Sequence, residues 1–155
     1  MTEAKRRRIN AALNDSRIHV IRGGLNHHRP AISERSTRND FMSTTEQVLA
    51  SHETALGEQN AEKVSTHYAK DAVVVVNGDI YHGPKEIALM YAGLINDLPD
   101  ATWRTDMAVI HEDLAYVEWA CESGISKVEY GTDTFIVTNG LITIQTASFS
   151  IVLKY

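Results

Sequence analysis

The sequence contains a single cysteine, Cys121, so no disulfide bond can form within the chain. Cysteine usage of this kind is compatible with a reducing compartment, and we expect a cytoplasmic protein. No apolar run approaches the ~20 residues that a membrane span needs, so no membrane partner is predicted. Cys121 falls within a predicted strand and has no nearby base in the sequence, which predicts a small core residue and not a nucleophile.

Several motifs that carry chemistry are also missing. The sequence has no glycine-rich loop of the kind that cradles phosphates, so neither a nucleotide nor any other cofactor is predicted. The histidines are scattered without the spacing of metal ligands, so no metal site is predicted. No serine lies in the sharp strand-to-helix turn that exposes a catalytic serine.

Charge is unevenly distributed along the chain. Residues 1–42 carry nine Lys and Arg against four Asp and Glu, whereas residues 43–155 carry six against sixteen. The first segment also lacks sustained apolar periodicity, so we expect a flexible basic N-terminal extension before a folded domain at 43–155. Met42 is a natural chain start, and truncation to it should leave thermal stability unchanged. The acidic domain would repel phosphate backbones, so nucleic acid is not an expected partner.

Two helices are predicted at the start of the folded part. Ser43-Thr-Thr-Glu46 has the spacing of a capping box, which opens a helix over 43–58. The apolar stripe of this helix is interrupted by His52. A second, short helix is predicted over 60–69, and Tyr68 lies on its apolar stripe.

A strand, a short return strand and a third helix follow. The β-branched run at 72–76 predicts a buried strand that ends at Asn77-Gly78, and a short strand at 80–82 can pair back across that turn. The third helix is predicted over 83–98, with a proline in its first turn. Tyr91 lies on its inner face.

The remainder of the chain predicts four long strands separated by short turns. These strands cover residues 102–111, 114–122, 127–138 and 141–154. Asn139-Gly140 is a strong hairpin signal because both residues tolerate the positive φ of a type I′ turn. Helices followed by strands predict an α+β fold, in which a cone-shaped curved antiparallel sheet and three N-terminal helices enclose a pocket.

Alternation along the third long strand puts Asp133 on the same face as Phe135. Together with His52, Tyr68 and Tyr91, it makes four polar groups that are predicted to point into apolar surroundings. A carboxylate in such a place costs several kcal/mol unless it is paired or protonated. Burial raises its pKa, and a neutral carboxylic acid can donate a hydrogen bond to a ligand oxygen. Each residue alone is compatible with an ordinary core, but their convergence predicts a functional pocket.

At these residues the chain resembles the nuclear-transport-factor-2-like superfamily, and within it the SnoaL-like and ketosteroid-isomerase-like proteins. The motifs that carry the resemblance are the helix at 48–60, His67-Tyr-Ala-Lys-Asp-Ala72, Asn77-Gly78, His82-Gly83 and Gly131-Thr-Asp-Thr-Phe135. It covers about residues 44–155. It implies a cone of curved sheet with three helices, and often a homodimer through the outer sheet face, where Tyr130 and Ile136 are expected.

The resemblance also implies roles for individual residues. Asp133 lies where ketosteroid isomerases place the protonated aspartic acid of their oxyanion hole. His52 lies where the oxyanion-hole tyrosine of those enzymes sits, and Tyr68 and Tyr91 match positions that buttress it in some of them. The general-base aspartate of those enzymes falls on Val76. Valine cannot move a proton, so steroid isomerisation by that mechanism is not implied.

Two functions of different classes follow. In the first, Asp133 and His52 are an acid–base pair, with a histidine pKa near neutrality, that isomerises, cyclises or dehydrates a small hydrophobic carbonyl or hydroxyl compound. In the second, the domain is a non-catalytic ligand-binding or dimerisation module. The predicted pocket residues are Tyr68, Tyr91, Val76, Trp103, Trp119, Phe135 and Gln145.

Overall fold

The computed structural model describes residues 17–20, by their backbone alone, and residues 44–155. The helices are α2 (Thr45–Gly57), α3 (Ala61–Ser65) and α4 (Gly83–Asp97). The strands are β1 (Arg17–Val20), β2 (Tyr68–Val76), β3 (Asp79–His82), β4 (Thr102–His111), β5 (Leu114–Glu122), β6 (Ser126–Thr138), β7 (Leu141–Phe149) and β8 (Val152–Leu153).

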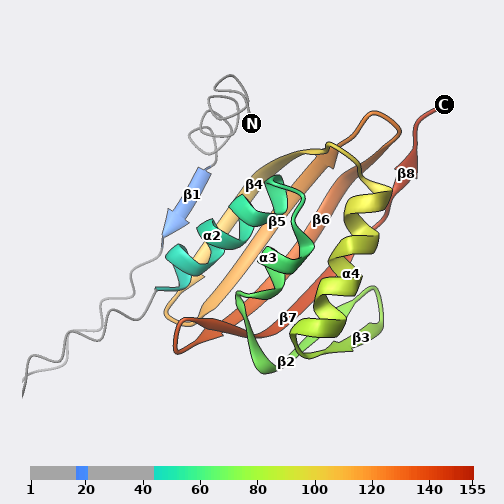
Figure 1. Ribbon diagram of the computed structural model, residues 1–155. Helices are drawn as coiled ribbons and strands as arrows, with labels where there is room; N and C mark the ends of the chain where they lie inside the picture. The colour runs from blue at the N-terminus through green and yellow to red at the C-terminus, as the bar shows by residue number, and fades with distance from the viewer. Residues whose placement is uncertain (1–16, 21–43) are drawn as a thin grey trace, which may run out of the picture.

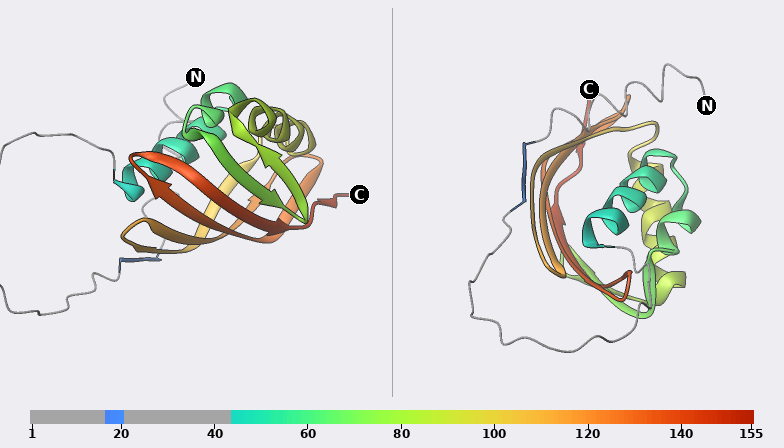
Figure 2. Two further views of the ribbon diagram at one scale, coloured as in Figure 1. Left: turned by 90° about the horizontal axis from the view of Figure 1, so that it is seen from below. Right: turned by 90° about the vertical axis from the view of Figure 1, so that its left-hand side faces the viewer.

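All of these strands belong to one curved sheet. Its order is β1-β4-β5-β6-β7-β2-β3, and β8 pairs with β6 off this path. The meander β4–β7 is antiparallel, whereas β2 runs parallel to β7 and β1 parallel to β4. The sheet curves around the three helices, which cover its concave side (Figures 1 and 2). The predicted α+β fold is therefore confirmed, as a mostly antiparallel, unclosed sheet with helices on one face.

The start of α2 differs by one residue from the prediction. Its N-cap is Thr44, whose hydroxyl accepts from the Gln47 N–H while the Gln47 side chain accepts from the Thr44 N–H. The capping box of α2 is therefore Thr44 with Gln47, one residue later than the predicted pair, whose first member, Ser43, lies outside the described residues. Both pairs have the same three-residue spacing, so sequence alone does not choose between them.

The second helix is shorter than predicted. α3 ends at Ser65, and Tyr68 opens strand β2 instead of closing a helix. The backbone of β7 explains the difference, because the Ile142 N–H donates to the His67 carbonyl at 2.8 Å and Tyr68 pairs with Ile142. A strand partner remote in sequence thus overrides a weak helical pattern.

The C-terminal segment forms the predicted hairpin, but its last strand is interrupted. Asn139 and Gly140 both have positive φ, as a type I′ turn requires. The single strand predicted over 141–154 is two strands, because the chain leaves β7 after Phe149 and β8 pairs with residues 126–127 of β6.

Four residues of the predicted N-terminal extension join the sheet. The backbone of β1 pairs with Met107–Ile110 of β4 and so adds a strand to that edge of the sheet. The predictions for the rest of the extension, including the chain start at Met42, lie outside the described residues.

The core lies between the concave sheet face and the inner faces of the helices. Val64 of α3, Ile87 of α4 and Ile142 of β7 are completely buried there. Burial of aliphatic side chains of this size stabilises the fold by roughly 1.5–3 kcal/mol each. No helix in the described part of the chain has the length and apolarity to cross a membrane.

Candidate functional site

A closed set of hydrogen bonds joins four buried polar side chains from four elements, two helices and two strands. The His52 Nε2 of α2 lies 3.0 Å from the hydroxyls of both Tyr68 and Tyr91. These two hydroxyls are 2.9 Å apart. On β7, Gln145 accepts from the Tyr68 hydroxyl at 2.5 Å, and its Nε2 donates to the Tyr91 hydroxyl at 3.2 Å.

The network meets the hydrogen-bonding requirement of groups that would otherwise be costly to bury. Each of the four residues is at most 4% exposed. Phe135 packs edge-on against the His52 ring, with centroids 5.6 Å apart. Because Tyr68 lies on β2 and not on a helix, the network links α2, α4 and two strands, which fixes the helices over the sheet.

Electrostatics keep this network uncharged. Burial, and then the nearby His67, lower the pKa of His52 to about 3. Burial likewise raises the pKa values of the Tyr68 and Tyr91 hydroxyls. His52 is therefore neutral at physiological pH, which differs from the predicted histidine with a pKa near neutrality.

Asp133 does not pair with His52, in contrast to the sequence-based prediction. It is partly buried on β6, and its Oδ1 is shielded from solvent without a hydrogen-bond partner. Burial raises the pKa of this carboxyl to about 7; the nearby Gln145 amide and Trp119 indole N–H oppose the shift, and Glu53 adds to it. A carboxyl with this pKa is mostly protonated below pH 7 and about half protonated at pH 7, which is the direction expected for a buried acid.

The second unsatisfied atom lies beside the first. Trp119 is 8% exposed, and its Nε1 has no hydrogen-bond partner. Trp119 pairs across the strands with Gly131, two residues from Asp133 on the same face of β6. Among the described residues, the Trp119 Nε1 and the Asp133 Oδ1 are the two buried side-chain polar atoms without a partner.

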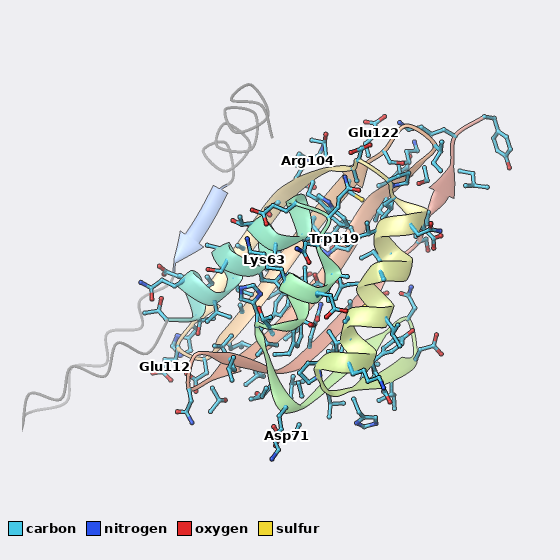
Figure 3. The ribbon with its side chains drawn as sticks, in the orientation of Figure 1. Lys63, Asp71, Arg104, Glu112, Trp119 and Glu122 are labelled. Carbon is cyan, nitrogen blue, oxygen red and sulfur yellow. The ribbon has the colours of Figure 1, made fainter. Side chains whose placement is uncertain are left out.

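Gly131 is what allows the indole to lie across β6. A Cβ built at Gly131 would come within 2.5 Å of Trp119 Cε2, closer than real side chains approach. The glycine of the Gly131-Thr-Asp133 motif therefore makes room for the ring beside the carboxyl. Figure 3 shows Trp119 within the body of the fold, whereas the labelled charged residues Asp71, Glu112 and Glu122 lie at its margins.

The other predicted site residues lie on the same concave surface. Trp103 is partly buried on β4 and packs against Trp119 in a tilted arrangement, with ring centroids 5.4 Å apart and an interplanar angle of 51°. Val76 is 9% exposed and occupies the row of β2 that leads through Ala147 to Asp133. The structure thus places the predicted residues around one surface, in two groups joined by Gln145.

One carboxyl of this surface is absent from the sequence-based prediction. Glu53 of α2 is partly buried, and its Oε1 accepts from the Thr105 hydroxyl of β4 at 3.5 Å. Burial raises its pKa, and the Thr105 hydrogen bond opposes that rise. The helical spacing of Glu53 could have predicted that it faces inward, because it lies four residues after Leu49 and three before Leu56 of the apolar stripe.

Within residues 44–155, no group of three or more His, Cys, Asp or Glu side chains is arranged to hold an ion. Cys121 is buried, and burial raises the pKa of its thiol to about 11, as suits a core residue.

The fold and the arrangement of the concave surface define a protein of the nuclear-transport-factor-2-like, ketosteroid-isomerase-like class. The model of the SnoaL-like domain family matches residues 48–145, and the chain belongs to that family. No curated protein matches the sequence.

Solved structures support the same fold at low sequence identity. A protein from Catenulispora acidiphila with a ketosteroid isomerase-like fold, solved in complex with trimethylamine, is 17% identical with a TM-score of 0.59 and coverage of 70% of this chain and 88% of its own. An NTF-2 like protein from Burkholderia xenovorans is 14% identical, with a TM-score of 0.60 and coverage of 71% and 85%. A third, from Mesorhizobium loti, is 13% identical, with a TM-score of 0.60 and coverage of 72% and 95%. Both of the latter are of unknown function.

Proposed function

We propose that the protein binds a small apolar compound carrying a carbonyl or hydroxyl oxygen on the concave surface of its sheet. In the complex, the neutral Asp133 carboxyl and the Trp119 indole N–H both donate to that oxygen. Two donors aimed at one oxygen polarise it, which is the requirement of isomerisation, cyclisation and dehydration.

The observation that carries this proposal is the pair of unsatisfied polar atoms. A buried polar atom without a partner costs roughly 1–3 kcal/mol, so native proteins keep few of them. Here two occur side by side, on Trp119 and Asp133, and they are flanked by apolar and aromatic side chains. A ligand oxygen would satisfy the indole N–H and the protonated carboxyl together, and the rings of Trp103 and Phe149 would cover the ligand's apolar part.

A non-catalytic ligand-binding module is the second candidate. It is favoured by Val76, which has no group that accepts a proton, at the position of the family base. It is also favoured by His52, whose lowered pKa makes it a weak base and whose Nε2 already bonds two tyrosine hydroxyls. On this alternative the same two donors orient a ligand without transforming it.

The binding proposal is tested with 2-tetralone and with tetralin, which is the same bicycle without the oxygen. Titration of Trp fluorescence should show tighter binding of 2-tetralone at pH 6, by roughly 3–10-fold for a hydrogen bond gained. The preference should shrink at pH 8, because Asp133 then loses its proton. Asp133→Asn keeps a donor but does not titrate, so its preference should be independent of pH. Equal affinities of the two compounds at pH 6 would contradict the proposal.

We propose further that the protein is a homodimer through the outer sheet face. Leu114, Ile136 and Ile144 lie in one row across β5, β6 and β7 on the face away from the helices. Leu114 is 42% and Ile144 47% exposed, an unusual loss of burial for aliphatic side chains in a continuous row. A second copy of this face would cover the row.

Light scattering tests this assembly. Ile144→Lys should convert the dimer to a monomer, because a charge in an apolar interface is costly to desolvate. Ile80→Lys is the matched control, since Ile80 is also exposed but lies on β3, away from the row. A wild-type protein that is monomeric at micromolar concentration would exclude the proposed dimer.

A further inference from the structure

Glu53 is a carboxyl on the concave surface with no part in the hydrogen-bond network of His52. Its side chain leaves α2 towards β4, where the Thr105 hydroxyl donates to it. Thr105 pairs across the strands with Trp119. Glu53 therefore lies over the part of the sheet where the Trp119 ring also lies.

Asp133 lies near the same ring, on strand β6. Trp119 pairs with Gly131, and Asp133 follows on the same face of β6. Strands β4 and β6 are two strand spacings apart, about 10 Å. Glu53 thus reaches this surface from the β4 side and Asp133 from β6, and a flat compound bound beside the Trp119 indole would have a carboxyl near each of two edges.

We propose that Glu53 is the proton-accepting catalytic residue of this site. The inference rests on the proposed function, since Glu53 acts on a carbonyl compound that Asp133 and Trp119 hold. The Glu53 carboxylate takes a proton from the carbon next to the carbonyl, and the electron pair of that C–H bond forms the C=C bond of an enolate. The carbonyl π pair moves to the oxygen, which accepts from the Asp133 O–H and the Trp119 N–H. Return of the proton from Glu53 to the same or a conjugated carbon completes an isomerisation.

With Glu53 as the base, the site does not need a proton acceptor at the position of Val76. Val76 lies in the row that runs through Ala147 to Asp133, on the β7 side of the carboxyl. Glu53 approaches from the β4 side instead. A base supplied by α2 would therefore reach the opposite edge of a ligand held at Asp133.

The proposed step needs an ionised Glu53 and a protonated Asp133. Glu53 faces Thr105 and the Asp133 carboxyl; Asp133 faces Glu53, Gln145 and Trp119, with the Tyr68 and Tyr91 hydroxyls also near. None of these groups is a cation, and burial raises the pKa of both carboxyls, that of Asp133 to about 7. The exchange rate should therefore fall at low pH, where Glu53 gains a proton, and fall again above about pH 7, where Asp133 loses its own.

The experiment follows exchange of the protons next to the carbonyl of 2-tetralone in D2O by NMR. Glu53→Gln should slow the protein-dependent exchange by about 100-fold or more, the usual contribution of a general base. Its affinity for 2-tetralone should stay within about threefold of wild type, because the two donors are intact. Glu46→Gln is the matched control on the same helix, since Glu46 is exposed in its first turn.

The variant Thr105→Val distinguishes a catalytic role of Glu53 from a purely structural one, because only a catalytic role predicts a shift in the pH profile. It removes the hydroxyl that opposes the rise in the Glu53 pKa, so the acidic limb of the exchange profile should shift to higher pH. Wild-type exchange that persists in Glu53→Gln, or a bound ketone that does not exchange, would overturn the role of Glu53 and leave the binding function. Failure of 2-tetralone to bind the wild-type protein would count against the binding function itself.

Discussion

Replacing Asp133 by asparagine should make the protein more stable at pH 8 than the wild type. The folded carboxyl has a pKa of about 7, against an ordinary value of 3.8. Between these values the folded state holds a proton that the unfolded state has released, so wild-type stability falls as the pH rises. Each unit of difference corresponds to about 1.4 kcal/mol, and the shift of about three units gives about 4 kcal/mol above pH 7. Asparagine does not titrate and avoids this loss.

The pH dependence of wild-type stability alone does not isolate Asp133, because His52 also contributes to it. Its pKa is lowered to about 3, so the unfolded state binds a proton below pH 6.5 that the folded state rejects. Its contribution to stability therefore rises with pH from about 3 to 6.5, opposite in sign to that of Asp133. In the wild type the two slopes oppose each other, whereas Asp133→Asn should keep the His52 slope and lose that of Asp133.

Urea unfolding followed by circular dichroism from pH 4 to pH 8 measures the difference. The gain in the free energy of unfolding should be small at pH 4, grow to about pH 7 and then level off. A gain that does not change with pH would refute the reasoning, because it would mean that the folded environment leaves the Asp133 pKa at its ordinary value.

Three further outcomes follow from other parts of the structure. Gly131→Ala should destabilise the fold by about 1–3 kcal/mol and alter Trp fluorescence, because its Cβ would overlap the Trp119 ring; Gly93→Ala, in an open position of α4, should be neutral or stabilising. Tyr68→Phe should lower the free energy of unfolding by about 1–2 kcal/mol, since Gln145 and His52 lose a partner, whereas Tyr81→Phe, whose hydroxyl makes no hydrogen bond among the described residues, should have little effect. Truncation to Met42 removes β1 from the β4 edge and should lower the melting temperature by about 2–4 °C for a loss of about 1 kcal/mol; an unchanged value would favour the sequence-based expectation of an independent extension.

Local signals in the sequence were enough for most of the architecture. The alternation of apolar residues, the Asn139-Gly140 turn and the β-branched run at 72–76 correctly predicted the principal strands, because each depends on residues close in the chain. The inward placement of Asp133 beside Phe135 followed from the same alternation. The end of α3 could not be predicted from local signals, because the strand that begins at Tyr68 depends on pairing with β7, more than seventy residues later.

By itself, therefore, the sequence determined the family, the order of the principal elements and most of the side chains that face inward. Only the tertiary structure decided which of those side chains meet. Strand register brings Trp119 beside Asp133, and the approach of α2 to β4 brings Glu53 to the same ring. The tertiary structure also encloses His52 between two tyrosines, where burial keeps the imidazole neutral. The physical reason is that desolvation and hydrogen-bond partners, which set protonation, arise from contacts between segments far apart in the chain.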